Sequence, residues 1–277
     1  MRMESYKIGL CQMPVTADKQ ENLKTAADYV AKAKAQGAQV VVLPEMFCCP
    51  YNNDSFVANR EARGGSVYTA LADAARKNNV VLIGGSMPEE DDGKIYNTCF
   101  VFDGAGNEIA RHRKMHLFDI DVKGGQYFKE SDTFTAGNDV TVVDTPYGKI
   151  GVAICFDIRF PELARMMQTA GATVLVYPGA FNMTTGPAHW EVTGRARAVD
   201  NQCYVAMCCQ SRDETASYVA YGHSMILTPW GAVASSLEAE AGIVLAEIDP
   251  AYVADIRAQL PLISAARTDV YRLPEMV

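Results

Sequence analysis

The chain has 277 residues, 49% of them hydrophobic, and a formal net charge of −8. This length and apolar content suffice for one large core, so we expect residues 1–277 to form a single domain. The negative charge argues against nucleic acid and anionic membranes, and favours a small-molecule partner. Without an apolar run near the roughly 18 residues of a spanning helix, or a signal-peptide segment at the start, the sequence predicts a cytoplasmic protein with no membrane partner.

Runs typical of strands alternate in part with amphipathic helical stretches. The sequence predicts strands at 6–12, 40–43, 80–84, 98–102, 149–154, 173–177, 203–209 and 223–228. It predicts helices at 22–35, at 66–78, after Pro161 and at about 189–201. Turn signals at 103–107 and 229–231 indicate hairpins, and hence mixed sheets. This pattern suits two mixed sheets packed face to face with helices outside.

A carboxylate follows the predicted strand at 40–43. Three valines and a leucine are followed by Pro44 and Glu45, where the chain must turn. The ends of buried strands commonly carry functional side chains, because loops at a sheet edge are open to ligands. Glu45 is therefore a candidate acid or base.

A basic run follows the predicted hairpin at 103–107. We interpret Arg111 and Arg113 as solvated surface charges. Lys114 differs because an apolar stretch follows it, through Phe118, and draws this part of the chain inward. Lys114 is the second candidate.

A thiol, Cys155, ends the predicted strand at 149–154, and a helix is expected to begin behind Pro161. A sulfur at a strand-to-helix junction faces a cleft and the positive end of the helix dipole, which lowers the thiol pKa. A buried core cysteine is the alternative, since free cysteine is among the most buried residue types. The presence of Glu45 and Lys114 at two other strand ends favours the interpretation of Cys155 as a nucleophile.

These three side chains can together hydrolyse an amide, which requires a nucleophile, a proton carrier and an oxyanion stabiliser. Cys155 would attack, Glu45 would carry the thiol proton to the departing ammonia, and Lys114 would stabilise the oxyanion. The backbone N–H of Phe156, directly after the nucleophile, is the expected second donor. The proton shuttle requires a closed pocket around Glu45.

Eight cysteines, at 11, 48, 49, 99, 155, 203, 208 and 209, raise the question of disulfides or metal. No Cys-x-x-Cys occurs, adjacent cysteines are poor zinc ligands, and a chain of this length needs no cross-links. We therefore expect reduced cysteines, no metal and no cofactor. A Cys-His pair with His116 or His189 as the base is the competing catalytic interpretation.

The order Glu45, Lys114, Cys155 resembles the three motifs of the nitrilase superfamily of carbon-nitrogen hydrolases. The likeness runs from 7–10 to 268–271, and it implies an α/β fold, an αββα four-layer sandwich of two mixed β-sheets with outer helices. Within the superfamily the chain is most similar to the omega-amidase branch, through HLFDID (116–121), YPGAFN (177–182), TGPAHWE (185–191) and RAVDNQ (197–202). The deaminated-glutathione amidases share several of these segments.

The resemblance implies an amidase that converts short dicarboxylic acid monoamides, such as α-ketoglutaramate and succinamate, to acid and ammonia through a cysteine thioester. A deaminated glutathione amidase or an N-carbamoyl amide hydrolase of the same superfamily is the alternative. A catalytically silent binding protein is the alternative outside enzymes. The family also forms dimers in which C-terminal tails pack near the interface, so we expect a homodimer with residues 260–277 at its interface.

Glu130 matches a second glutamate that the family places beside the lysine, although an exposed loop carboxylate is the alternative. It lies in a stretch of little periodicity, 115–138, which we interpret as a substrate-covering loop. Lys123 stands in this loop where the branch usually has proline, and Phe156 stands where many members have tyrosine.

The remote carboxylate of such a substrate needs a cation, and Arg159, four residues after the nucleophile, is the candidate because guanidinium binds carboxylate bidentately. An ion pair of Arg159 with Glu162 or Asp157 is the alternative. Tyr51 is expected to offer a hydroxyl to the same carboxylate. Phe181 is either an apolar wall of the site or core packing.

Overall fold

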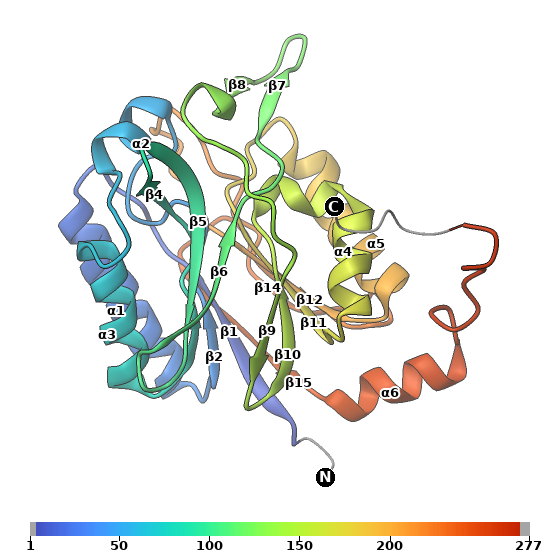
Figure 1. Ribbon diagram of the computed structural model, residues 1–277. Coiled ribbons are helices and arrows are strands. Elements are labelled where there is room, and N and C mark those ends of the chain that lie inside the picture. The colour runs from blue at the N-terminus through green and yellow to red at the C-terminus, as the bar shows by residue number, and fades with distance from the viewer. Residues whose placement is uncertain (1–3, 272–277) are drawn as a thin grey trace.

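The computed structural model describes residues 4–271. Two mixed sheets pack face to face between two layers of helices (Figure 1). The predicted αββα sandwich is confirmed.

The first sheet has the strand order β15-β1-β2-β3-β5-β4, with β6 beside β5. The pairs β1–β2 and β2–β3 are parallel and the others are antiparallel. The bounds are β1 (Tyr6–Gln12), β2 (Val40–Val42), β3 (Val81–Ile83), β4 (Met87–Asp91), β5 (Lys94–Phe102), β6 (Glu108–Arg113) and β15 (Gly242–Ile248).

The second sheet has the order β14-β13-β12-β11-β10-β9, and its pairs β10–β11 and β11–β12 are parallel. Its strands are β9 (Thr141–Thr145), β10 (Gly148–Val152), β11 (Val174–Gly179), β12 (Tyr204–Cys209), β13 (Met225–Leu227) and β14 (Val233–Ser236). Each sheet thus has three parallel strands at its centre, which brings several strand ends to the same edge of the sandwich.

The period of two along a strand divides the first sheet between two cores. Ile8, Val40 and Val42 face the second sheet and cluster with its residues, whereas Val41 and Leu82 face the helices. All five are fully or almost fully buried, and each such side chain stabilises the fold by roughly 1.5–3 kcal/mol. These strands have continuous apolar runs in the sequence because both of their faces are covered.

The helices α1 (Lys19–Ala35) and α3 (Ser66–Asn78) cover the first sheet, and α4 (Pro161–Thr169) and α5 (Gly186–Asn201) cover the second (Figure 1). Asp18 caps α1 by accepting the N–H groups of Gln20 and Glu21. Two helices were not predicted, α2 (Asn53–Asn59) and α6 (Pro250–Gln259).

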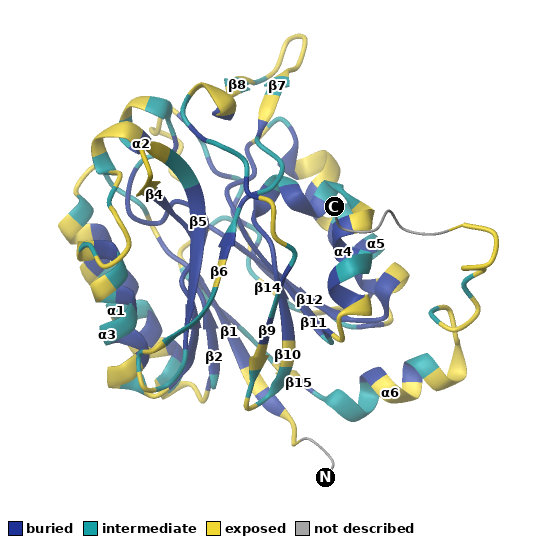
Figure 2. Ribbon diagram, viewed as in Figure 1, coloured by how far each residue is buried: buried dark blue, intermediate teal, exposed yellow. Residues whose placement is uncertain are grey.

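The hairpins predicted at 103–107 and 229–231 join β5 to β6 and β13 to β14. The stretch 115–138 differs from the prediction, because it contains the hairpin of β7 (Asp119–Asp121) and β8 (Tyr127–Lys129) and the short helix η1 (Glu130–Asp132). Strands of three residues are too short to show a period of two. The hairpin projects from the sandwich, and its outer part is exposed (Figure 2).

Beyond α6 the described part of the tail, 260–271, is largely exposed, and residues 272–277 of the predicted interface segment lie outside the described residues. All eight cysteines are free and buried. No helix within residues 4–271 is long and apolar enough to cross a membrane.

Candidate active site

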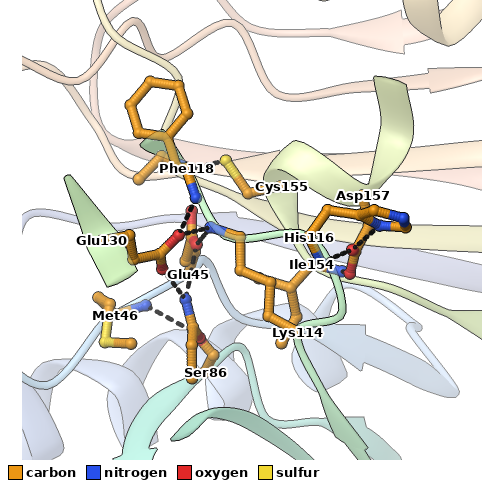
Figure 3. A network of polar contacts seen from close by, with 12 residues as sticks. Glu45, Met46, Ser86, Lys114, His116, Phe118, Glu130, Ile154, Cys155 and Asp157 are labelled. Carbon is orange, nitrogen blue, oxygen red and sulfur yellow. Dashed lines mark hydrogen bonds and ion pairs between the residues drawn. The ribbon is translucent and has the colours of Figure 1, made fainter. Parts of the chain in front are cut away.

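The three candidate side chains come from segments that follow strands of both sheets. Glu45 follows β2, Lys114 directly follows β6, and Cys155 begins the short 3-10 helix η2 (Cys155–Arg159) after β10. Glu130 joins them from the base of the β7–β8 hairpin (Figure 3). The structure thus brings together four residues that span more than a hundred positions in the sequence.

Lys114 is the centre of this group. Its Nζ donates to Glu45 Oε1 at 2.9 Å and to Glu130 Oε2 at 2.8 Å, and all three side chains are fully buried. Burial opposes the charged form, but the carboxylates of Glu130 and Glu45 outweigh it and raise the pKa of Lys114. The amine therefore stays protonated, and its third N–H has no partner among residues 4–271.

Asn97 on β5 links the two carboxylates, and the sequence analysis missed it. Its Nδ2 donates to Glu45 Oε1 at 2.9 Å and to Glu130 Oε1 at 3.0 Å. Its backbone carbonyl also accepts the N–H of Lys114 at 2.8 Å. Asn97 lies just before the predicted strand at 98–102, so its place on β5 was not recognised, although asparagine is disfavoured in strands.

Glu130 is a buried carboxylate, so its interpretation as an exposed loop residue is wrong. Its Oε2 also accepts the backbone N–H of Phe118 at 2.6 Å, which ties the hairpin base to the site. Burial, followed by the charge of Glu45, raises the pKa of Glu130 against the opposing effects of Lys114 and Asn97. Glu130 and Glu45 both pair with the same cation, the ammonium of Lys114.

Cys155 occupies a left-handed backbone conformation, with φ of +46°, at the turn after β10. Such a conformation costs on the order of 1–3 kcal/mol for a residue other than glycine, and sharp turns of this kind present nucleophiles. The thiol is only 5% exposed and accepts the backbone N–H of Ala180 at 3.5 Å.

The expectation that a helix dipole lowers the pKa of Cys155 is wrong. Burial, followed by the charge of Glu45, raises that pKa well above its usual value, although Lys114 and the Ala180 N–H oppose the shift. The helix η2 has only five residues, and desolvation of the thiolate outweighs its small dipole. The free thiol is therefore protonated at neutral pH, and its reaction needs a base.

Glu45 has one carboxylate oxygen available for that task. Its Oε1 accepts from Lys114 and Asn97 and, at 3.4 Å, from the hydroxyl of Tyr51. Its Oε2 is buried and has no hydrogen bond to the other described groups, while the carboxylate lies close enough to the Cys155 thiol to raise its pKa. This oxygen is occupied by no other donor among the described residues, so it is free to accept the thiol proton.

Tyr51, predicted to bind the substrate carboxylate, has a protein partner in the structure. Its hydroxyl is directed to Glu45, and its ring packs on Tyr218 and Phe128 with centroid distances of 4.5 and 5.3 Å. In this structure Tyr51 therefore donates to the Glu45 carboxylate from a cluster of aromatic rings.

Within residues 4–271, Arg159 is a cation without a carboxylate partner. Its guanidinium lies 4.9 Å from the ring centroid of Phe181 and 5.4 Å from that of Phe156, and Nη1 is 3.0 Å from His189 Nδ1. No ion pair with a carboxylate is found within the described residues, so the alternative pairing with Glu162 or Asp157 is wrong. Burial lowers the pKa of Arg159, while the nearby Cys155 opposes the shift.

Phe156 follows the nucleophile, and its backbone N–H has no acceptor among the described residues. The two candidate histidines have other partners, because the ring of His116 contacts Asp157 Oδ1 at 2.7 Å and that of His189 contacts Arg159. In the described part of the chain neither hydrogen-bonds Cys155, which argues against the Cys-His interpretation.

An αββα sandwich in which a thiol, an ammonium and two carboxylates meet beside the strand ends has the arrangement of a hydrolytic enzyme. Residues 7–258 match the family model described as carbon-nitrogen hydrolase. The chain belongs to this family of hydrolases acting on carbon-nitrogen bonds, within the nitrilase superfamily, as the sequence analysis predicted.

Omega-amidase NIT2 of Danio rerio is 50% identical to this chain over 269 residues, which are 97% of each protein. Omega-amidase NIT2 of Homo sapiens is 46% identical over 269 residues, 97% of this chain and 98% of that protein. The crystal structure of Saccharomyces cerevisiae Nit3, a member of branch 10 of the nitrilase superfamily, superposes with a TM-score of 0.89 at 38% identity, covering 96% of this chain and 98% of that one.

Proposed function

We propose that this protein is an omega-amidase that hydrolyses the terminal amide of short dicarboxylic acid monoamides, such as α-ketoglutaramate and succinamate, to acid and ammonia. The observation that carries the substrate class is Arg159, a partly buried guanidinium near the thiol with no carboxylate of its own among the described residues. The similarity to the omega-amidase NIT2 proteins supports the same class.

In the first half of the reaction, Cys155 Sγ attacks the amide carbon while Glu45 Oε2 takes the thiol proton. The third N–H of Lys114 and the backbone N–H of Phe156 donate to the oxygen that becomes negative, and each such donor contributes on the order of 10²–10³ in rate. Glu45 then gives the proton to the nitrogen as the C–N bond breaks, which leaves ammonia and a thioester.

In the second half, Glu45 takes a proton from a water molecule that attacks the thioester carbon. Lys114 and Phe156 stabilise the second tetrahedral intermediate in the same way. The C–S bond breaks, the thiolate regains a proton from Glu45, and the dicarboxylic acid leaves. Lys114 remains an ammonium throughout, because Glu130 stays paired with it while Glu45 carries the proton.

Arg159 would bind the remote carboxylate of the substrate bidentately. The rings of Phe181 and Phe156 hold its guanidinium, and Arg197 holds its backbone by donating from Nη2 to the Arg159 carbonyl at 3.0 Å. The position of the cation is thus determined before the substrate arrives.

Arg159→Ala is expected to raise KM for succinamate about 10- to 100-fold, as the loss of a hydrogen-bonded charge pair of about 1.5–3 kcal/mol implies. KM for a neutral amide of the same length, such as butyramide, should change little. Steady-state kinetics on both substrates, with Arg159→Lys as the matched variant that keeps the charge but not the planar fork, makes the comparison. Equal effects of Arg159→Ala on the two substrates would contradict the assignment.

Ammonia release from α-ketoglutaramate, succinamate and deaminated glutathione, with Cys155→Ala as the blank, tests the proposed function. A strong Cys155-dependent preference for the two short monoamides supports the omega-amidase. A preference for deaminated glutathione would move the substrate class while leaving the mechanism, and activity only on N-carbamoyl compounds would overturn the proposal.

We further infer that the protein acts in the cytoplasm as a homodimer of this single domain. Its eight free cysteines suit a reducing compartment. Exposed large apolar side chains occur on α5, on the β13–β14 turn and in the tail, namely Val192, Val199, Trp230, Leu260 and Leu262. Four of them line an apolar depression of about 220 Å³, which supports an interface that includes the start of the tail.

Light scattering after size exclusion is expected to give twice the 30.1 kDa chain mass. Trp230→Glu should shift the protein toward the monomer, because it puts a charge into an apolar interface. Exposed Tyr127, on the projecting hairpin, offers a control, and Tyr127→Glu should leave the mass unchanged. A wild-type monomer at micromolar concentration would contradict the inference.

A further inference from the structure

We propose that Asp157 is a positioning residue that sets the spacing between Lys114 and Cys155, an inference that rests on the proposed function. Asp157 lies on η2, two residues after the nucleophile, and is fully buried. It has no hydrogen bond to the groups that would contact the substrate among the described residues. Its effect would therefore pass through the two segments that it joins.

Four donors meet this one carboxylate. Oδ1 accepts the backbone N–H of His116 at 2.9 Å and its ring Nδ1 at 2.7 Å. Oδ2 accepts the ring Nε2 of His112 at 3.0 Å and the backbone N–H of Ile154 at 2.9 Å. Figure 3 shows Asp157 with the groups of His116 and Ile154 directed to it, beside the network around Lys114.

The positions of these donors in the sequence show which two segments the carboxylate connects. His112 and His116 lie two residues before and two residues after Lys114, and Ile154 directly precedes Cys155. Asp157 therefore forms hydrogen bonds on both sides of Lys114. It also bonds the residue directly before Cys155. It couples the two segments across the interface between the sheets, since β6 belongs to the first sheet and η2 follows the second.

The coupling has two physical consequences. The left-handed backbone of Cys155 persists only where neighbouring contacts over-determine it, and the bond to the Ile154 N–H is one of these contacts. The coupling also determines which ring nitrogens of the two histidines are donors, because an ionised carboxylate can only accept hydrogen bonds. His112 Nε2 and His116 Nδ1 must each carry a proton, and these donors hold the pKa of Asp157 well below its usual range in spite of burial.

A general contribution to stability is the competing explanation, and Glu89 on β4 offers a matched control. Glu89 is also fully buried, and it accepts from Thr98 Oγ1 at 2.8 Å, Arg111 Nη1 at 2.9 Å and Arg113 Nε at 2.8 Å. The two arginines, expected to be solvated, thus pair with it. Glu89 bonds the strand that precedes Lys114 but makes no bond to the nucleophile turn among the described residues, so Glu89→Gln removes a buried charge without breaking the link between the two segments.

Asp157→Asn keeps the size of the side chain but turns one acceptor oxygen into an amide that faces two donors. We expect kcat for succinamate to fall about 10- to 100-fold, as small misplacements of reacting groups do. KM should change less than about threefold, since Arg197 holds the backbone of Ile158 and Arg159 independently. Glu89→Gln should lower the melting temperature with kcat near the wild-type value.

The pH dependence of Cys155 alkylation by iodoacetamide gives a second readout that does not require the substrate. The titratable groups facing the thiol are Glu45, Lys114, Arg159, Tyr51 and Tyr218. If Asp157→Asn lets Lys114 move away, the apparent pKa of alkylation rises. If the variant only removes a negative charge, that pKa falls, because the thiolate is less opposed.

His116→Phe is the milder variant, and it decides the matter if Asp157→Asn does not fold. It keeps the stacking on Phe160, where the ring centroids are 3.5 Å apart, and loses only the ring donor. A lower kcat with a raised alkylation pKa, and neither change in Glu89→Gln, supports the proposal. An unchanged kcat, a lowered alkylation pKa, or an equal loss of kcat in Glu89→Gln overturns it. If the wild-type protein hydrolyses none of the amides, but Asp157→Asn still raises the pKa of Cys155 alkylation and Glu89→Gln does not, the proposed function alone is overturned.

Discussion

Cys155→Ala is expected to abolish ammonia release from succinamate, with a fall in kcat on the order of 10⁴-fold or more. The variant removes the only atom that forms the thioester, and neither Glu45 nor Lys114 offers another nucleophile in a covalent route. The buried thiol occupies a strained turn, so the smaller alanine should leave the fold and the network around Lys114 intact. Ammonia assays together with thermal unfolding separate loss of chemistry from loss of structure.

The covalent intermediate can be observed directly. Hydroxylamine should trap the wild-type acyl-enzyme as a hydroxamate, and intact-mass analysis should show the acyl adduct on Cys155. Cys99 provides the matched control, because it is a free and fully buried cysteine on β5, and Cys99→Ala should retain turnover and the adduct. Measurable turnover by Cys155→Ala above the assay blank would remove Cys155 from its proposed role.

Glu45→Gln is expected to lower kcat about 10²- to 10⁴-fold with little change in stability. The carbonyl oxygen of glutamine can still accept from Lys114, Asn97 and Tyr51, so the hydrogen bonds that Oε1 makes in the native site are retained. The amide nitrogen replaces Oε2 and cannot take a proton from the thiol. Acylation would then depend on the small fraction of spontaneous thiolate, because burial still raises the pKa of Cys155 even though the charge of Glu45 no longer adds to that shift.

Glu130→Gln distinguishes the two carboxylates. Glu130 also pairs with Lys114 and Asn97, but both of its oxygens are occupied, by Asn97 on Oε1 and by Lys114 and the Phe118 N–H on Oε2. It has no free oxygen to carry a proton, so Glu130→Gln should cost much less in kcat than Glu45→Gln. Single-turnover acylation rates of both variants make the comparison, and equal losses would contradict the assignment of Glu45 as the sole base.

The strands of the core could be predicted from the sequence, whereas several outer elements could not. Apart from Lys7 and Gln12, the runs at 6–12 and 40–43 are apolar on both faces because one face meets the other sheet and one meets the helices, and such runs are a strong strand signal. The strands β7 and β8 have three residues each and mostly exposed side chains, so they leave no periodic signal. Their pairing depends on contacts at the base of the hairpin, where Glu130 meets Phe118.

The candidate site divides in a similar way. Glu45, Lys114 and Cys155 stood out because reactive side chains at the ends of buried strands are chemically conspicuous. Asn97 and Asp157 did not. The Asn97 side chain bonds residues 33 and 52 positions away, and Asp157 bonds residues 41 and 45 positions away, apart from its local bond to Ile154. Such partners become neighbours only when both sheets are assembled.

The sequence by itself determined which strands form the core, where two hairpins turn, and which acid, amine and thiol the site contains, since periodicity and residue chemistry are local properties. Only the tertiary structure decided the state of those groups. Burial raises the pKa of Cys155 where a helix dipole was expected to lower it, and two carboxylates keep Lys114 charged. The tertiary structure also leaves Arg159 without a carboxylate partner among the described residues. Desolvation and pairing depend on the distance between atoms in space, which the order of residues along a chain does not contain.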